Sequence, residues 1–122
     1  MKTILLVEDD PFLIDIYLTK FKEAGFLIEV AVDGEAALKK LAEKKFDLLV
    51  LDLVLPQMDG WEILKKVQSD SRFQSLPVVI LSNLGQKSEV EKGLEAGATK
   101  YLIKAHYTPS EVLEEIKEIL KP

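Results

Sequence analysis

The chain has 122 residues, of which 48% are apolar and 30% charged, and its formal net charge is −5. It contains no cysteine and one histidine, His106, so disulfides are excluded and a zinc site, which needs several histidine or cysteine ligands, is not expected. The acidic balance argues against nonspecific nucleic-acid binding, and the acid-containing first twenty residues lack the apolar stretch of a signal peptide or membrane span. We therefore expect a cytoplasmic protein.

Strand and helix patterns alternate from the start of the chain. A nearly continuous apolar strand is expected over residues 3–8. Asp10 followed by Pro11 predicts the start of a helix, because Asp is a good N-cap and Pro suits the first helical position. Gly25 is expected to close this helix. The expected apolar points of the helix are Phe12, Ile16 and Phe21.

The alternation continues to the end of the chain. Further strands are expected at residues 27–32, 47–52, 77–82 and 100–103. Further helices are expected after residues 33–34, after residues 59–60, over residues 87–96 and from residue 109. The apolar residues expected to face the core from these helices are Ala37, Leu38, Leu41, Ile63, Leu64, Val67, Val90, Leu94, Val112, Leu113, Ile116, Ile119 and Leu120. Five strand–helix units predict an α/β fold with a parallel sheet covered on both faces, formed by residues 1–122 as one domain.

Four of the expected strands end in polar residues. Glu8 and Asp9 lie at the end of the first strand, Asp52 ends the third, Ser82 ends the fourth, and Lys104 follows the fifth. Right-handed crossovers place the carboxyl ends of parallel strands at one edge of the sheet, which is where such sheets bind ligands. We therefore expect these five side chains to meet in one pocket.

The predicted cluster of three acids favours a divalent cation. Two carboxylates about 4 Å apart repel by roughly 4 kcal/mol at an effective dielectric near 20, so the cluster needs a counter-ion or a proton. Oxygen ligands without His or Cys indicate Mg²⁺ or Mn²⁺. An ammonium and a hydroxyl across the pocket, from Lys104 and Ser82, can hold a phosphoryl group, and a carboxylate can itself accept one.

Four segments of the sequence resemble the receiver domains of bacterial two-component response regulators, including the chemotaxis regulators, and the resemblance extends over essentially the whole chain. The matching pieces are Leu-Val-Glu-Asp-Asp at residues 6–10, Leu-Asp-Leu-Val-Leu-Pro-Gln-Met-Asp-Gly at 51–60, Ile-Leu-Ser-Asn at 80–83 and Gly-Ala-Thr-Lys-Tyr-Leu-Ile-Lys at 97–104. Each piece has modest specificity, whereas their order and spacing together are highly specific. The resemblance implies a flavodoxin-like (βα)5 fold of three layers, with the parallel strands in the order 2-1-3-4-5.

The resemblance also implies roles for the acidic residues. Asp52 would accept a phosphoryl group from a phosphohistidine on a sensor histidine kinase or a histidine phosphotransfer protein. Glu8 and Asp9 would position Mg²⁺, for which Mn²⁺ can substitute, with Asp52 and the backbone carbonyl of Val54 as further ligands. The implied chemistry is that of a phosphoacceptor signalling domain, limited to its own phosphorylation and dephosphorylation.

The remaining implied roles concern the response to the phosphoryl group. Ser82 and Lys104 would bind its oxygens, and Tyr101 would be a switch aromatic that turns inward as Ser82 moves toward the phosphate. Phosphorylation would shift an existing equilibrium and change the surface around the fourth helix, fifth strand and fifth helix. The expected recipient is a downstream protein or an output domain, and neither nucleic acid nor a membrane is expected to contact this domain.

Three positions depart from the family pattern. Ala105 follows Lys104 where the family usually has proline, and we expect a trans peptide there because a non-proline cis bond costs about 2.5–4 kcal/mol. Asn83 replaces a residue that is often small, and its bulk is expected to narrow access to the phosphoryl group. Ser82 replaces the commoner threonine and keeps the hydroxyl. His106, a lone loop histidine, is expected to be exposed to solvent.

Two other functions fit parts of the pattern. A Mg²⁺-dependent phosphohydrolase with an aspartate nucleophile usually needs a second acid close to it, whereas Leu53 and Val54 follow Asp52. A flavodoxin-like cofactor binder would have a loop rich in Ser, Thr and Gly after the first strand, whereas Glu-Asp-Asp-Pro stands at residues 8–11. Turnover of an external phosphoester would distinguish the hydrolase from the phosphoacceptor.

Overall fold

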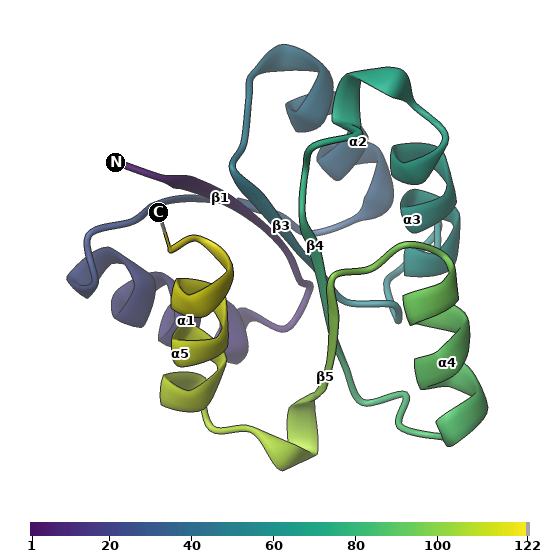
Figure 1. The fold of residues 1–122 in the computed structure, drawn as a ribbon. Helices are drawn as coiled ribbons and strands as arrows, with labels where there is room; N and C mark the ends of the chain where they lie inside the picture. Colours follow the sequence, from purple (N-terminus) through teal and green to yellow (C-terminus); the bar gives the residue numbers. More distant parts are fainter. Residues whose placement is uncertain (122) are drawn as a thin grey trace.

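A parallel sheet of five strands forms the centre of the molecule in the computed structural model, which describes residues 1–121 (Figure 1). The strands are β1 (Thr3–Val7), β2 (Leu27–Ala31), β3 (Leu48–Leu51), β4 (Val78–Ser82) and β5 (Lys100–Ile103). The helices are α1 (Pro11–Glu23), α2 (Gly34–Glu43), α3 (Gly60–Gln68), α4 (Lys87–Glu95) and α5 (Pro109–Ile119), with short 3₁₀ turns at Ser71–Phe73 and Lys104–His106. None of the helices in these 121 residues has the length and apolar character needed to span a membrane.

The strands lie in the order β2-β1-β3-β4-β5, and every neighbouring pair is parallel. This confirms the predicted flavodoxin-like order. In the register of the central pair, Val7 lies beside Leu51. The residues that follow β1 and β3 therefore leave the sheet next to each other, at the same edge.

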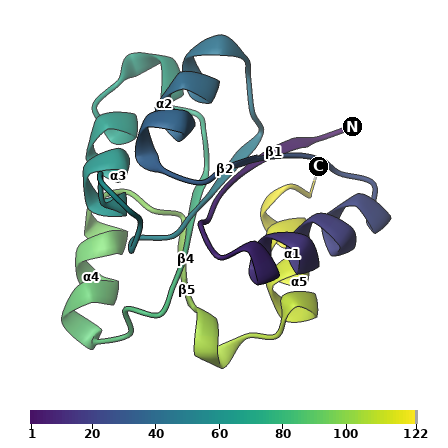
Figure 2. The same ribbon diagram turned by 180° about the vertical axis from the view of Figure 1, so that it is seen from behind.

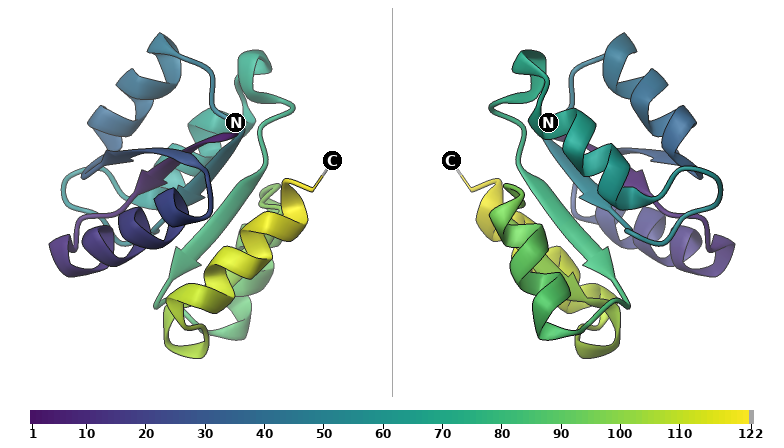
Figure 3. Two further views of the ribbon diagram at one scale, coloured as in Figure 1. Left: turned by 90° about the vertical axis from the view of Figure 1, so that its left-hand side faces the viewer. Right: turned by 90° about the vertical axis from the view of Figure 1, so that its right-hand side faces the viewer.

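Helices cover both faces of the sheet, with α1 and α5 on one face and α2, α3 and α4 on the other (Figures 2 and 3). Because successive residues of a strand point to opposite faces, Ile4 and Leu6 pack with the first layer, while Leu5 and Val7 pack with the second. Two apolar cores result, and both faces of the central strands are buried. Continuous apolar strands are the expected sequence signature of such a sheet.

Polar side chains fix the beginnings of most helices. Asp10 is the N-cap of α1 and accepts hydrogen bonds from the backbone N–H groups of Phe12, at 2.9 Å, and Leu13, at 3.4 Å. The predicted role of Asp10 as a helix cap is confirmed. Side chains also cap three other helices, namely Asp33 for α2, Asp59 for α3 and Thr108 for α5.

Two helices face the core with residues other than those expected. Phe12 is 73% exposed and Leu94 is 45% exposed, so both expectations are wrong. In α1 the buried residues are Tyr17 and Phe21, four positions apart and hence on one face of the helix. In α4 the buried residue is Gly93, one position before Leu94, and a step of one residue turns the helix by about 100°.

Candidate functional site

Three acidic residues converge at the carboxyl edge of the sheet, as predicted. Glu8 and Asp9 follow β1, and Asp52 follows the neighbouring β3. Each offers a carboxylate oxygen, and these three oxygens all lie within 4.8 Å of one another. Glu8 and Asp52 are buried, whereas Asp9 is exposed, so the cluster opens to solvent on the side of Asp9.

Lys104 completes the cluster from the end of β5. Its Nζ atom lies 2.7 Å from Oε1 of Glu8 and 2.7 Å from Oδ2 of Asp52, and its side chain is mostly buried. The ammonium therefore links the acids of two different strand ends. The sequence predicted this convergence, although it did not predict that Lys104 would contact both carboxylates directly.

Burial and ion pairing shift the pKa values of Glu8 and Lys104 in opposite directions. Burial raises the pKa of the Glu8 carboxyl, and the hydrogen bonds from Lys104 and from the Asp10 backbone oppose it only in part. Burial would lower the pKa of Lys104, but its hydrogen bonds to Asp52 and Glu8 outweigh burial and raise it. Lys104 therefore stays protonated. The negative charge of the Glu8 carboxylate is destabilised by burial, so a further cation beside it would be favourable.

Backbone groups fix the orientation of both buried acids. The second oxygen of Glu8, Oε2, accepts hydrogen bonds from the backbone N–H groups of Asp9 and Asp10, each at 3.1 Å. Oδ1 of Asp52 accepts one from the N–H of Val54 at 3.1 Å. Val54 is 56% exposed, so the loop after β3 reaches the surface next to Asp52. The sequence singled out Val54 for its carbonyl and missed the role of its N–H group.

The loop after β3 folds back tightly onto the strand. A Cβ atom on Gly60 would lie 2.4 Å from the backbone oxygen of Asp52, so only glycine fits at the start of α3. The N–H of Gly60 donates to the carbonyl of Leu53 at 2.9 Å. Gln57 in the same loop has a φ of 67°, a left-handed conformation that its residue type does not announce. This closure holds the backbone of Asp52 in place.

Ser82 and Tyr101 both form hydrogen bonds with the backbone of the same residue, Leu84. Ser82 is fully buried at the end of β4, and its Oγ accepts a hydrogen bond from the N–H of Leu84 at 3.4 Å. The hydroxyl of half-buried Tyr101 donates to the carbonyl of the same Leu84. Burial raises the pKa of Tyr101 to about 12. No sequence signal marked Leu84, because its contribution comes from the backbone alone.

The other sequence-based expectations about this region concern the loop after β5. The peptide bonds of residues 1–121 include no cis bond, so the expected trans link between Lys104 and Ala105 is confirmed. The loop continues as the 3₁₀ turn Lys104–His106, and His106 is exposed, as expected. Asn83 is also exposed beside the site.

The arrangement can bind a divalent metal ion. Glu8, Asp9 and Asp52 supply only carboxylate oxygens, which suit hard cations such as Mg²⁺ and Mn²⁺. The ammonium of Lys104, in contact with Glu8 and Asp52, adds a positive charge that can bind an anionic ligand. A carboxylate, a cation site and an ammonium are the parts that transfer of a phosphoryl group requires.

Comparisons with known proteins agree with this geometry. Residues 4–117 match the family model of the response regulator receiver domain. The chain is 32% identical over 121 residues to the DNA-binding dual master transcriptional regulator RpaA of Synechocystis, an alignment that covers 99% of this chain and 50% of RpaA. The alkaline phosphatase synthesis regulatory protein PhoP of Bacillus subtilis is 34% identical, with 98% of this chain and 49% of PhoP covered. The chain thus spans about half the length of these curated relatives.

Solved structures give the same result. A response regulator structure from Chloroflexus aurantiacus superposes with a TM-score of 0.90 at 32% identity, covering 99% of this chain and 98% of that one. The Mn²⁺-bound form of response regulator Rcp1 superposes with a TM-score of 0.88 at 25% identity, with coverages of 98% and 94%. This chain belongs to the family of response regulator receiver domains, the phosphoacceptors of two-component signalling.

Proposed function

We propose that Asp52 is the phosphoacceptor of this receiver domain. The observation that carries the proposal is the position of its carboxylate, which is buried at the end of β3, oriented by the N–H of Val54 and paired with Lys104 at 2.7 Å. These contacts restrict the orientation of the carboxylate, which reduces the entropic cost of bringing it to a phosphoryl donor. A carboxylate oxygen of Asp52 forms the new bond to phosphorus, the phosphorus–nitrogen bond of a phosphohistidine breaks, and its electron pair returns to the imidazole.

We further propose that Glu8, Asp9 and Asp52 hold Mg²⁺, together with the backbone carbonyl of Val54, and that Mn²⁺ can substitute. The all-oxygen donor set and the excess of negative charge in the cluster support this assignment. The bound metal would neutralise charge on the transferring phosphoryl group. A relative of the same fold, Rcp1, is known in a Mn²⁺-bound form.

The phosphoryl group would be read by Lys104 and Ser82. Lys104 already contacts Asp52 and can exchange that contact for one with a phosphoryl oxygen. Ser82 lies at the adjacent strand end, and its hydroxyl is linked through Leu84 to Tyr101, the proposed switch residue. The donor would be a sensor histidine kinase or a histidine phosphotransfer protein, and the recipient a downstream protein or an output domain.

Phosphorylation by a small donor tests the assignment of Asp52. The chain is incubated with acetyl phosphate and Mg²⁺, and intact-mass spectrometry measures the addition of one phosphoryl group. We expect the addition in the parent and its loss in Asp52→Asn. Asp10→Asn is the matched control, because Asp10 is the neighbouring acid whose side chain caps α1, Asn caps equally well, and the substitution leaves the backbone N–H that donates to Glu8. Equal phosphorylation of Asp52→Asn and the parent would exclude Asp52 as the acceptor.

A further inference from the structure

Helix α4 rests on the sheet through a glycine. Gly93 is the buried residue of this helix, while its neighbours Lys92 and Leu94 are exposed. Glycine is a poor helix former because it loses the most backbone freedom on folding. A glycine inside a helix therefore usually has a reason in the packing.

The reason here is the ring of Tyr101. A Cβ atom built on Gly93 would lie 2.7 Å from Cδ2 of Tyr101 and 2.8 Å from Cδ1 of Ile80. Carbon atoms pack at about 3.5–4.0 Å, so a side chain at position 93 needs either the ring or the helix to move. The tyrosine ring occupies the space that the absent side chain leaves.

The position of this ring is connected to the candidate site. The hydroxyl of Tyr101 donates to the carbonyl of Leu84, and the N–H of Leu84 donates to Oγ of Ser82. If the ring were pushed out, the Leu84 carbonyl would lose its partner, and the loop between β4 and α4 would be free to shift. Ser82 stands at the base of that loop.

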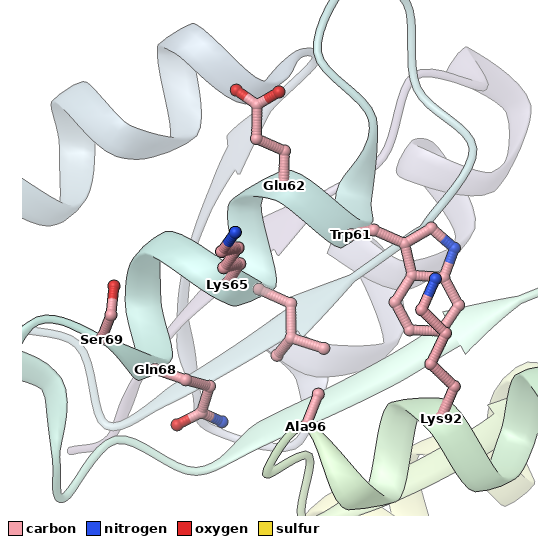
Figure 4. A pocket seen from close by; sticks show the side chains of 8 residues that line it. Trp61, Glu62, Lys65, Gln68, Ser69, Lys92 and Ala96 are labelled. Carbon is pink, nitrogen blue, oxygen red and sulfur yellow. The ribbon is translucent and has the colours of Figure 1, made fainter.

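Lys92, the residue before Gly93, forms a second contact that joins α4 to α3. The Nζ atom of Lys92 lies 4.2 Å from the centre of the Trp61 ring, an arrangement with the geometry of a cation–π interaction (Figure 4). Trp61 directly follows Gly60, which packs against the backbone of Asp52. A displacement of α4 would therefore separate Lys92 from the indole as well.

We propose that Gly93 is a positioning residue for the phosphoryl-binding site: the absence of a side chain there lets the Tyr101 ring pack against α4 and thereby holds the Leu84 backbone beside Ser82. The effect on phosphoryl binding rests on the role proposed above for Ser82. The packing of the Tyr101 ring against Gly93 does not depend on that role.

The test compares Gly93→Ala with the parent in two measurements on the full chain. The first is the ionisation of the Tyr101 hydroxyl in metal-free protein, followed by NMR of the tyrosine rings and assigned with Tyr101→Phe. We expect the Tyr101 pKa, about 12 in the parent, to fall toward 10 in Gly93→Ala because the ring becomes exposed. The second is the affinity for beryllofluoride, a phosphoryl analogue, in the presence of Mg²⁺, which we expect to weaken by at least about fivefold, the lower end of typical coupling between sites.

Gly85→Ala is the matched control, since a Cβ there would lie 3.3 Å or more from its three nearest neighbours, which are all side-chain atoms of Ile103, and both measurements should match the parent. Combining Gly93→Ala with Tyr101→Leu removes the ring, and the double variant should bind beryllofluoride as Tyr101→Leu alone does. If Gly93→Ala does not fold but the double variant does, the steric relation is supported; if neither folds, Gly93 serves packing against Ile80 and the proposal is wrong.

The two proposals fail in distinguishable ways. An unchanged Tyr101 pKa in folded Gly93→Ala would overturn the positioning role, whatever the domain binds. A lowered Tyr101 pKa with unchanged beryllofluoride affinity would overturn the link from Tyr101 to the phosphoryl site. A parent that binds no beryllofluoride would contradict the proposed function, while the titration would still decide whether Gly93 positions Tyr101.

Discussion

Lys104 balances the charge of two buried carboxylates, so its replacement by methionine should destabilise the metal-free protein. Methionine keeps much of the side-chain volume and removes the charge. The carboxylate oxygens of the cluster lie within 4.8 Å of one another, and two unit charges at that separation repel by about 3.5 kcal/mol at an effective dielectric near 20. We expect Lys104→Met to lower the free energy of unfolding by about 3–4 kcal/mol at pH 7, within the range for breaking a buried ion pair.

Urea unfolding measures this change, once in EDTA and once in excess Mg²⁺. The loss should be largest in EDTA and smaller with Mg²⁺, because the metal supplies the missing positive charge. Adding Asp52→Asn to Lys104→Met should also restore stability, because it removes one of the two repelling charges. The control is Lys100→Met, which breaks the surface ion pair with Glu115 and should cost at most about 1 kcal/mol.

Two outcomes would refute this reasoning. One is a Lys104→Met variant that unfolds in EDTA at the same urea concentration as the parent. The other is a loss of stability that neither Mg²⁺ nor Asp52→Asn reduces, since the cause would then be packing around the lysine stem and not charge.

Three further predictions concern other parts of the molecule. Tyr101 has a folded pKa of about 12 against a reference value of 10.0, so its contribution to stability is present below pH 10 and is lost as the pH rises toward 12. Tyr101→Phe should therefore show a smaller fall in the free energy of unfolding between pH 10 and pH 12, and a fall equal to the parent's would contradict the shift. Gly60→Ala places a Cβ 2.4 Å from a backbone oxygen and should lower both the melting temperature and the rate of phosphorylation by acetyl phosphate. The control Gly25→Ser lies at a position with open space around it, and this variant should change the melting temperature alone. Phe21→Ala should cost about 3–5 kcal/mol in urea unfolding, whereas Phe12→Ala, at an exposed position, should stay within about 0.5 kcal/mol; similar losses would mean that Phe12 is buried in solution.

The sequence predicted the convergence of the three acids and Lys104 because parallel topology makes the ends of neighbouring strands neighbours in space. Glu8, Asp52 and Lys104 lie 44 or more positions apart in the chain, yet each ends or follows an apolar strand. Once the strands are ordered, no detailed packing is needed to bring the three together. The contact of Lys104 with both acids could not be predicted from the sequence, because its flexible side chain can reach several atoms at that edge.

Helix faces were harder to predict than strand ends. Phe12 follows the spacing of Ile16 and was expected to point inward, but α1 lies on the sheet through Tyr17, roughly 140° away from Phe12 around the helix axis at about 100° per residue. In α4 the inward position belongs to Gly93, which has no side chain to contribute to an apolar pattern. A periodicity argument therefore selected Leu94, the nearest large apolar residue.

The different ways in which α3 and α4 rest on the sheet have a consequence for local stability. Helix α3 buries Ile63, Leu64 and Val67, whereas α4 buries only Gly93 among its residues. Opening α4 consequently exposes little apolar surface and should require less free energy than opening α3. The amide hydrogens of α4 should exchange with solvent deuterium well before those of α3, which makes α4 the helix that a change at the sheet edge can displace at the lowest cost.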